Sequence, residues 1–265
     1  MRDPLRFYQQ GLRRSKTLLC LASLSLLTAC TKPKTDPPPA ELIAPTRGPV
    51  GWVEGQVTAR GTLPALHPHP VDGALVKQCG AEVADLSLVV GTGGALQFAV
   101  ISVADAPPSK LAADFSPALL DQKGCLYQPP VVATRAGQSI KVRNSDPLLH
   151  NVRAMRESER LPIFNVMMPI ENLTVDKKLP AEPGIVELQC DVHPWMHAWA
   201  VTFAHDLYAV TSADGHFRID GVPVGHHVLK LWQPRLGEKR VEADVKADAG
   251  TTVDVGWEVS DMPAP

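Results

Sequence analysis

The sequence lacks the motifs of several common enzyme classes. It contains no P-loop, no G-x-S-x-G and no H-E-x-x-H pattern. A large excess of one charge sign is also lacking. The chain has 26 basic and 28 acidic residues, so it shows no electrostatic footprint for nucleic acid. No stretch shows a sustained helical period of apolar residues. These absences argue against the hydrolases and nucleotide-binding proteins that carry such motifs, against nucleic-acid binding and against a helical fold.

Long apolar runs are scarce, and the clearest one lies near the N-terminus. Residues 18–27 are apolar and follow Arg13, Arg14 and Lys16, which is typical of a signal peptide and too short to span a bilayer comfortably. The run ends in Leu-Thr-Ala-Cys30, which resembles the lipobox of bacterial lipoproteins. That resemblance implies loss of residues 1–29, lipidation of Cys30 and attachment to a membrane surface. An ordinary signal peptide with an incidental Cys30 is the alternative.

Residues 30–48 are rich in proline and polar residues. Such a composition buries little surface and favours extended conformations, so we expect a tether. Thr31, rather than Asp, follows Cys30, which favours the outer membrane. The predicted location is the cell envelope, anchored by lipid in the periplasm. Residues 1–29 hold five basic residues and one acidic residue, so the remaining chain has a formal net charge of −6.

Only five cysteines are present. Under the signal prediction, Cys20 leaves with the signal and Cys30 is the lipid anchor. An exported protein meets an oxidising compartment, where thiols tend to pair. Cys79 and Cys125 can form one disulfide, which leaves Cys190 as an odd thiol that metal ligation would explain. Pairing of Cys190 with one of the other two is the alternative.

The remaining chain has short apolar runs separated every eight to twelve residues by Gly, Pro, Asp or Asn. Several runs alternate polar and apolar residues and are rich in Val, Ile and Thr, which is typical of an antiparallel β-sandwich. We therefore predict an all-β fold with an N-terminal β segment (49–110), a central domain (111–205) and a C-terminal β domain (206–260). The expected strands are Gly51–Val57, Leu86–Val90, Leu96–Val103, Val131–Thr134, Ser139–Arg143, Ile185–Gln189, Ala200–Ala204, His216–Ile219, His227–Trp232 and Thr251–Val255.

Four metal-binding side chains stand out in the central domain. Cys190, His193 and Met196 follow one another at Cys-x₂-His-x₂-Met spacing, and His150 lies forty residues upstream. One thiolate, two imidazoles and a thioether form the ligand set of a mononuclear blue-copper site, in which the thioether is a weak axial ligand. Soft ligands favour copper, and a site that suits both oxidation states of copper suits single-electron transfer. No second copper-binding pattern such as H-x-H or H-C-H is present.

The residues around these ligands resemble the cupredoxins, particularly the plastocyanin and amicyanin branch. The resemblance covers about 124–203 and includes Ala136-Gly137, a strand ending in Asn144, Leu-His150-Asn-Val and the Cys190 loop with Pro after His. It implies an antiparallel Greek-key sandwich with one type 1 copper held by the four side chains named above. It also implies that Asn151 steadies the ligand loop and tunes the potential.

Two further residues of the ligand loop lie beside the expected copper site. Trp195 would pack against the site, where it could shape a docking surface or be a plain core aromatic. His197 follows Met196 and is either an alternative ligand or a solvent-facing loop residue. The edge of His193 or His197 would be the entry point for electrons.

A second resemblance covers about 206–258. Residues 211–229 follow the T-x-x-D-G-x-F-x-I-x-x-V-P-x-G-x-x-x-L pattern of carboxypeptidase regulatory-like modules, which implies a small transthyretin-like β-sandwich. Asp214-Gly215 is a strong signal for a hairpin turn between two strands. Sugar binding is associated with related folds and stays open as an alternative function.

Together these features predict a lipid-anchored, exported electron-transfer protein with one type 1 copper, and not an enzyme. Its partner would be a redox protein such as a cytochrome. Two alternatives stay open. The same site could store or carry copper, or the protein could be a surface lipoprotein that binds carbohydrate or protein through a fold with a structural metal.

Overall fold

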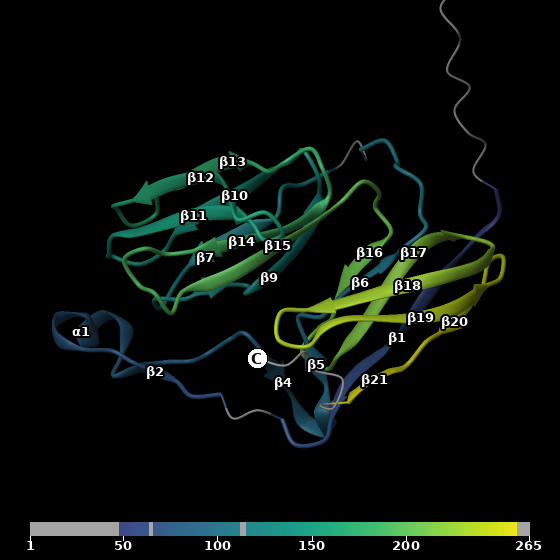
Figure 1. Cartoon of the computed structure of the whole chain (residues 1–265), viewed down its shortest axis with the longest axis horizontal. Coiled ribbons are helices and arrows are strands. Elements are labelled where there is room, and N and C mark those ends of the chain that lie inside the picture. Colours follow the sequence, from purple (N-terminus) through teal and green to yellow (C-terminus); the bar gives the residue numbers. More distant parts are fainter. Residues whose placement is uncertain (1–47, 64–65, 112–114, 259–265) are drawn as a thin grey trace, which may run out of the picture. The chain divides into compact units, whose positions relative to one another are not determined.

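The regular secondary structure of the described residues is almost all β-strand (Figure 1). The structure is a computed structural model that describes residues 48–63, 66–111 and 115–258. Within them the only α-helix is α1 (Val76–Cys79), preceded by the 3₁₀ turn η1 (Gly73–Leu75). The predicted all-β fold is confirmed. The predicted signal peptide, Cys30 and the tether up to residue 47 lie outside the described residues. No helix among the described residues is long and apolar enough to cross a membrane.

Residues 119–203 form a first sandwich of two sheets. Its strands are β7 (Leu119–Gln122), β8 (Tyr127–Gln128), β9 (Val131–Arg135), β10 (Ser139–Asn144), β11 (His150–Arg156), β12 (Leu161–Met168), β13 (Thr174–Lys178), β14 (Gly184–Gln189) and β15 (His197–Phe203). One sheet has the order β13-β10-β7-β8 and the other β12-β11-β14-β15-β9. Most neighbours are antiparallel, as predicted, but β7–β10 and β9–β15 are parallel pairs.

Alternation along the strands builds the core of the first sandwich. In β10, Ile140 and Val142 point inward and are fully buried, whereas the residues between them are partly exposed. The facing sheet contributes Val152 from β11 and Leu188 from β14 to the same cluster. The cluster also contains Cys190, so the predicted thiolate is part of this buried apolar core.

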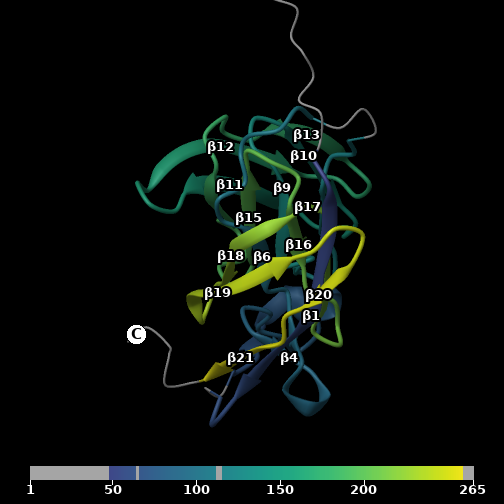
Figure 2. The same cartoon turned by 90° about the vertical axis from the view of Figure 1, so that its right-hand side faces the viewer.

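A second sandwich combines strands from both ends of the described chain. Its strands are β1 (Val50–Arg60), β6 (Val100–Val103), β16 (Tyr208–Val210), β17 (His216–Pro223), β18 (Gly225–Gln233), β19 (Gly237–Val245), β20 (Gly250–Thr252) and β21 (Val255–Glu258). One sheet has the order β17-β1-β20, with β21 also pairing with β1, and the other β16-β6-β18-β19. Figures 1 and 2 show the dark blue β1 beside the yellow strands β20 and β21, with which it pairs in parallel.

The long strand β1 explains this arrangement. Its inward positions Gly51, Val53, Gly55, Val57 and Ala59 are all buried and alternate with less buried residues. They face a cluster that includes apolar side chains of β6, β17 and β18. Residues 49–110 were predicted as an N-terminal β segment, apart from the C-terminal β domain at 206–260. The structure instead pairs β1 and β6 with strands of the predicted 206–260 module.

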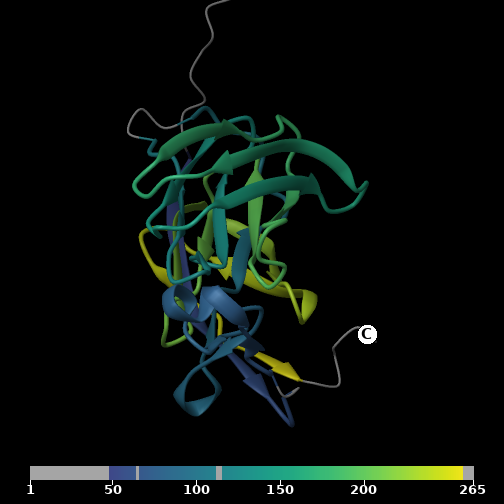
Figure 3. The same ribbon diagram turned by 90° about the vertical axis from the view of Figure 1, so that its left-hand side faces the viewer.

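The segment between β1 and β6 contains short elements: β2 (His69–Pro70), η1, α1, β3 (Glu82–Val83), β4 (Val89–Val90), η2 (Thr92–Gly94) and β5 (Leu96–Gln97). Residues 69–83, called here the disulfide-linked segment, include α1, the blue coil in Figure 3. A disulfide joins Cys79 of this segment to Cys125. Val71 and Val83 pack with Cys125 in a small apolar cluster, so the segment is held to the first sandwich by one covalent bond and by buried surface.

The expected hairpin at Asp214-Gly215 is wrong, although the turn exists. The Gly215 N–H donates to the Ser212 carbonyl at 2.9 Å, but β16 and β17 on either side belong to different sheets of the second sandwich. A turn signal specifies a local change of direction. It does not specify whether the next strand pairs with the previous one or crosses to the facing sheet.

Gly215 is required at this turn for two reasons. Its φ is +77°, and a Cβ there would lie 2.5 Å from the Val57 carbonyl oxygen. We expect Gly215→Ala to lower the free energy of unfolding by about 3 kcal/mol, combining the left-handed backbone cost with overpacking. Gly221→Ala is the matched control, because Gly221 has φ +71° but open space around it, and should cost about 1–2 kcal/mol. Equal losses in urea denaturation of the two variants would contradict the steric explanation.

Candidate metal centre

Neighbouring strands bring the predicted ligands together. His150 is the first residue of β11, and Cys190 directly follows β14. These two strands are antiparallel neighbours, so the start of β11 lies beside the end of β14. His193 and Met196 lie on the short connection from β14 to β15. The distant histidine and the local loop therefore meet at one end of the same sheet.

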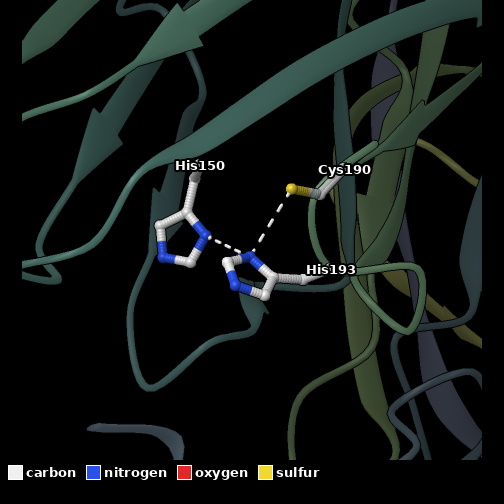
Figure 4. A group of neighbouring side chains, drawn as sticks. All are labelled: His150, Cys190 and His193. Atoms are coloured by element: carbon white, nitrogen blue, oxygen red, sulfur yellow. Dashed lines mark hydrogen bonds between the residues drawn. The ribbon is translucent and has the colours of Figure 1, made fainter. Parts of the chain in front are cut away.

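Three of the four predicted ligands form a compact buried group (Figure 4). The Nδ1 atoms of His150 and His193 are 2.9 Å apart, and the Cys190 Sγ lies 3.8 Å from Nδ1 of His193. One ligand atom of each of the three residues lies within 4.8 Å of the other two. The side chains thus converge on a single point, where a metal ion with nitrogen and sulfur ligands would fit in chemical type and in position.

The ligand loop is closed by its own backbone. The Met196 N–H donates to the His193 carbonyl at 2.9 Å, and the Cys190 N–H donates to the Met196 carbonyl at 3.2 Å. The Met196 side chain is fully buried in the apolar cluster that also contains Cys190. Its role as an axial ligand stays a prediction.

The surroundings of Cys190 lower the pKa of its thiol. Burial alone would raise its pKa, but hydrogen bonds from the two imidazoles and from backbone N–H groups outweigh burial and lower the pKa to about 5. One of these donors is the backbone N–H of Asn151. At neutral pH the group is therefore a thiolate, which is the form that binds metals.

Asp146 orients the first imidazole. Nε2 of His150 lies 2.9 Å from the Asp146 carboxylate, which also accepts backbone N–H groups of Gly124 and Cys125 at 2.7 and 2.8 Å. Burial would raise the pKa of Asp146, but these hydrogen bonds lower it below its usual range. An ionised carboxylate on Nε2 leaves Nδ1 of His150 free to bind a metal.

We expect Asp146→Asn to weaken copper binding by about 10–100-fold, because it removes the charge that fixes the ring nitrogen and its basicity. Competition with a chelator of known affinity measures the change. Asp176→Asn is the control, since Asp176 lies on β13 and contacts the exposed Lys141. An affinity of Asp146→Asn equal to that of Asp176→Asn would contradict this role for Asp146.

Asn151 connects the two parts of the site. Its Oδ1 accepts the Asp191 N–H at 2.7 Å and lies 3.3 Å from Cys190 Sγ, and its Nδ2 donates to the Asp191 carboxylate at 2.9 Å. Arg153 holds the other oxygen of that carboxylate at 2.7 Å. The Tyr127 hydroxyl donates to the Asn151 carbonyl. These contacts tie β11 to the ligand loop around the sulfur.

Trp195 covers the second imidazole. Its ring centroid lies 5.4 Å from that of His193, and its Nε1 donates to the Cys125 carbonyl at 3.0 Å. His193 is only 1% exposed, and its Nε2 is buried without a hydrogen-bond partner. Of the two predicted entry points for electrons, the edge of His193 is therefore not at the surface. Trp195 closes this side together with the disulfide-linked segment, whose Val71 and Val83 pack in the same cluster.

His197 lies outside the buried group. Its Nε2 is 2.8 Å from the Pro194 carbonyl oxygen, its Nδ1 is 3.9 Å from Glu187, and its side chain is 38% exposed. His197 is the first residue of β15, and these contacts agree with a solvent-facing residue more than with an alternative ligand.

Sequence reasoning missed three supporting residues, Asp146, Asp191 and Tyr127. Asp146 stands four residues before His150, and Asp191 directly follows Cys190. A carboxylate so near a predicted ligand is a usable signal. Tyr127 has no local signal, because only the packing of β8 against β11 brings it to the site.

Comparison with known proteins yields distant structural matches only. No family model and no curated protein matches the chain. A reduced Cu(I) form of an amicyanin variant at pH 4 is 19% identical, covers 39% of this chain and 98% of its own length, and gives a TM-score of 0.30. Amicyanin from Paracoccus versutus is 21% identical, with 39% and 97% coverage and a TM-score of 0.29. Likenesses this weak support no inference alone, so the fold and the site rest on this chain's own residues.

Proposed function

We propose that this protein binds one copper ion through His150, Cys190 and His193, with Met196 as axial ligand, and transfers single electrons. The observation that carries the proposal is the convergence of one thiolate and two imidazole nitrogens in a buried group. This donor set is that of a type 1 copper site. Copper, when bound, would supply a one-electron redox couple.

The protein's part is to hold these donors still and keep water out. His150 is fixed by Asp146, and the sulfur is held by the Asn151 N–H within a closed loop. Small movements of the ligands between oxidation states favour fast electron transfer, and the buried hydrogen bonds oppose larger ones. The donors are all buried, which supports electron transfer rather than catalysis on a bound substrate.

Because His193 is buried, electrons would not enter through an exposed edge of that ring. Trp195 is the partly exposed aromatic ring next to His193, and Cys125 accepts its N–H. We propose that electrons pass through the Trp195 side of the site, from a redox protein such as a cytochrome in the cell envelope. Lipidation at Cys30 would hold this protein at a membrane surface.

The test is a visible absorption and EPR spectrum of the purified full-length protein after addition of Cu(II). We expect an intense thiolate-to-copper band and a narrow copper hyperfine splitting. A pale, tetragonal signal, or no bound copper, would overturn the proposal.

Copper carriage is the second candidate function, and the burial of His193 favours it. A site without an exposed ligand edge would exchange electrons slowly with a docked partner, which weighs against electron transfer and for carriage. Stopped-flow oxidation and reduction by a small inorganic couple separates the two. Fast electron exchange with slow copper loss to a chelator supports electron transfer, whereas slow electron exchange with rapid copper loss supports carriage.

A further inference from the structure

A second group of metal-binding atoms lies on the other side of His150. The sulfur of Cys125, a carboxylate oxygen of Asp146 and a ring nitrogen of His150 lie within 4.8 Å of one another. All three residues are buried. The two nitrogens of His150 face different groups, because Nδ1 contacts His193 and Nε2 contacts Asp146.

The disulfide decides whether this second group can bind a metal. In the structure the Cys125 sulfur is bonded to Cys79, so the group offers only an imidazole and a carboxylate. A free thiolate at Cys125 would complete a set of sulfur, nitrogen and oxygen donors. The backbone around it is already organised, since the Cys125 N–H donates to Asp146 at 2.8 Å.

The two cysteines of the disulfide differ in burial. Cys79 is a partly exposed residue at the end of α1, whereas Cys125 is fully buried. An attacking thiolate would therefore approach at Cys79 and displace the Cys125 thiolate. The disulfide-linked segment, whose Val71 and Val83 pack against Cys125, is then no longer covalently held over the group.

We propose that reduction of the Cys79–Cys125 disulfide creates a second metal site, formed by Cys125, Asp146 and His150, that takes Cu(I). A dithiol supplies the two electrons: its first thiolate forms a mixed disulfide with Cys79, and its second thiol releases Cys79 and leaves a cyclic disulfide. The two protein cysteines gain the two protons. Binding of Cu(I) then displaces the proton of Cys125, and a thiolate selects this soft ion.

His150 gives the second site its significance. One imidazole would face both metal groups, through Nδ1 and through Nε2. A copper ion bound at Cys125 would therefore stand next to the predicted type 1 site, with a shared ligand between them. The thiol–disulfide state of the protein would therefore control whether Cu(I) can bind at Cys125. The inference does not depend on electron transfer as the function, because it uses only His150 from the first group.

The experiment compares two variants of the full-length protein that lose the same disulfide. Cys79→Ser leaves Cys125 free, and Cys125→Ser leaves Cys79 free; both are made in a Cys190→Ser background. Cu(I) is titrated without oxygen against a colorimetric chelator. We expect the Cys79→Ser variant to bind one more equivalent of Cu(I) than the Cys125→Ser variant, with an ultraviolet thiolate-to-copper band. Any Cu(I) that binds to His193 and Met196, which remain in the Cys190→Ser background, is the same for both variants and cancels in the comparison.

Two further measurements secure the result. Asp146→Asn in the Cys79→Ser background should weaken the extra site by at least about tenfold. The Cys190→Ser protein is also reduced with a dithiol, and the dithiol is then removed. This protein should bind the same extra equivalent of Cu(I), which tests the proposal without substitutions at the disulfide. Equal copper binding by the two variants, or no gain on reduction, would overturn it. Failure of the proposed function would instead show in the Cu(II) spectrum of the oxidised wild-type protein.

Discussion

Replacement of Cys190 by serine is expected to abolish the intense visible absorption of the copper-loaded protein while the chain stays folded. The absorption would arise from charge transfer between the thiolate and the metal, and Cys190 is the only free cysteine among the described residues. A serine hydroxyl does not ionise at neutral pH, whereas the Cys190 pKa is about 5. The variant would keep two imidazoles but lose the ligand that selects copper.

Stability should change little in this variant. Serine is close in size to cysteine, and its hydroxyl can use the hydrogen-bond acceptor Asn151 Oδ1, which lies 3.3 Å from the sulfur. We therefore expect a loss below about 2 kcal/mol in the apo-protein. Circular dichroism checks the fold, and absorption with EPR checks the site.

Val192→Ala is the matched control for Cys190→Ser. Val192 lies on the same loop, its side chain is exposed, and no metal-binding role is expected for it. It should keep the full colour. An intense band that survives in Cys190→Ser would contradict thiolate ligation, and a loss of colour in both variants would indicate damage to the loop rather than loss of a ligand.

Removal of the Cys79–Cys125 disulfide is expected to cause the largest loss of stability. The bond closes a loop with a sequence separation of 46 residues, and the chain-entropy relation gives about 4 kcal/mol for a loop of this size. The loss should appear when Cys79→Ser/Cys125→Ser is compared with wild type in urea denaturation without metal. The bond joins the disulfide-linked segment to the first sandwich, so unfolding of that sandwich should show the change.

Reduction of the wild-type protein provides the control for the disulfide variant. A dithiol should lower the midpoint of wild type toward that of the double variant and leave the double variant unchanged. A loss below about 1 kcal/mol would contradict the prediction, because the range expected for a native disulfide is about 2–5 kcal/mol.

Local patterns were enough to predict about half of the strands and the ligand loop, whereas β11, β12, β13 and β19 were not among the expected strands. The alternation of Val53 and Val57 along β1 marks one buried face, and the expected strands near 139–143 and 185–189 coincide with β10 and β14. The spacing from Cys190 to Met196 is also local, since a loop this short between two strands keeps its side chains near one point.

Pairing between strands could not be predicted in the same way. Alternation in β1 says which residues point inward but not which strand lies beside it, and its partners β17 and β21 lie more than 150 residues later in the chain. The same reasoning applies to the turn at Gly215, whose two strands enter different sheets. Pairing depends on which apolar faces cover one another, and that is a property of the whole chain.

The sequence by itself determined the all-β class and the odd cysteine, and it predicted the thiolate–imidazole–thioether donor set, because these follow from residue types and short spacings. Only the tertiary structure decided that Asp146 fixes His150, that Trp195 buries His193, and that Cys125 lies beside the same imidazole. The physical reason is that hydrogen bonds and burial join residues distant in the chain, and strand pairing sets those distances.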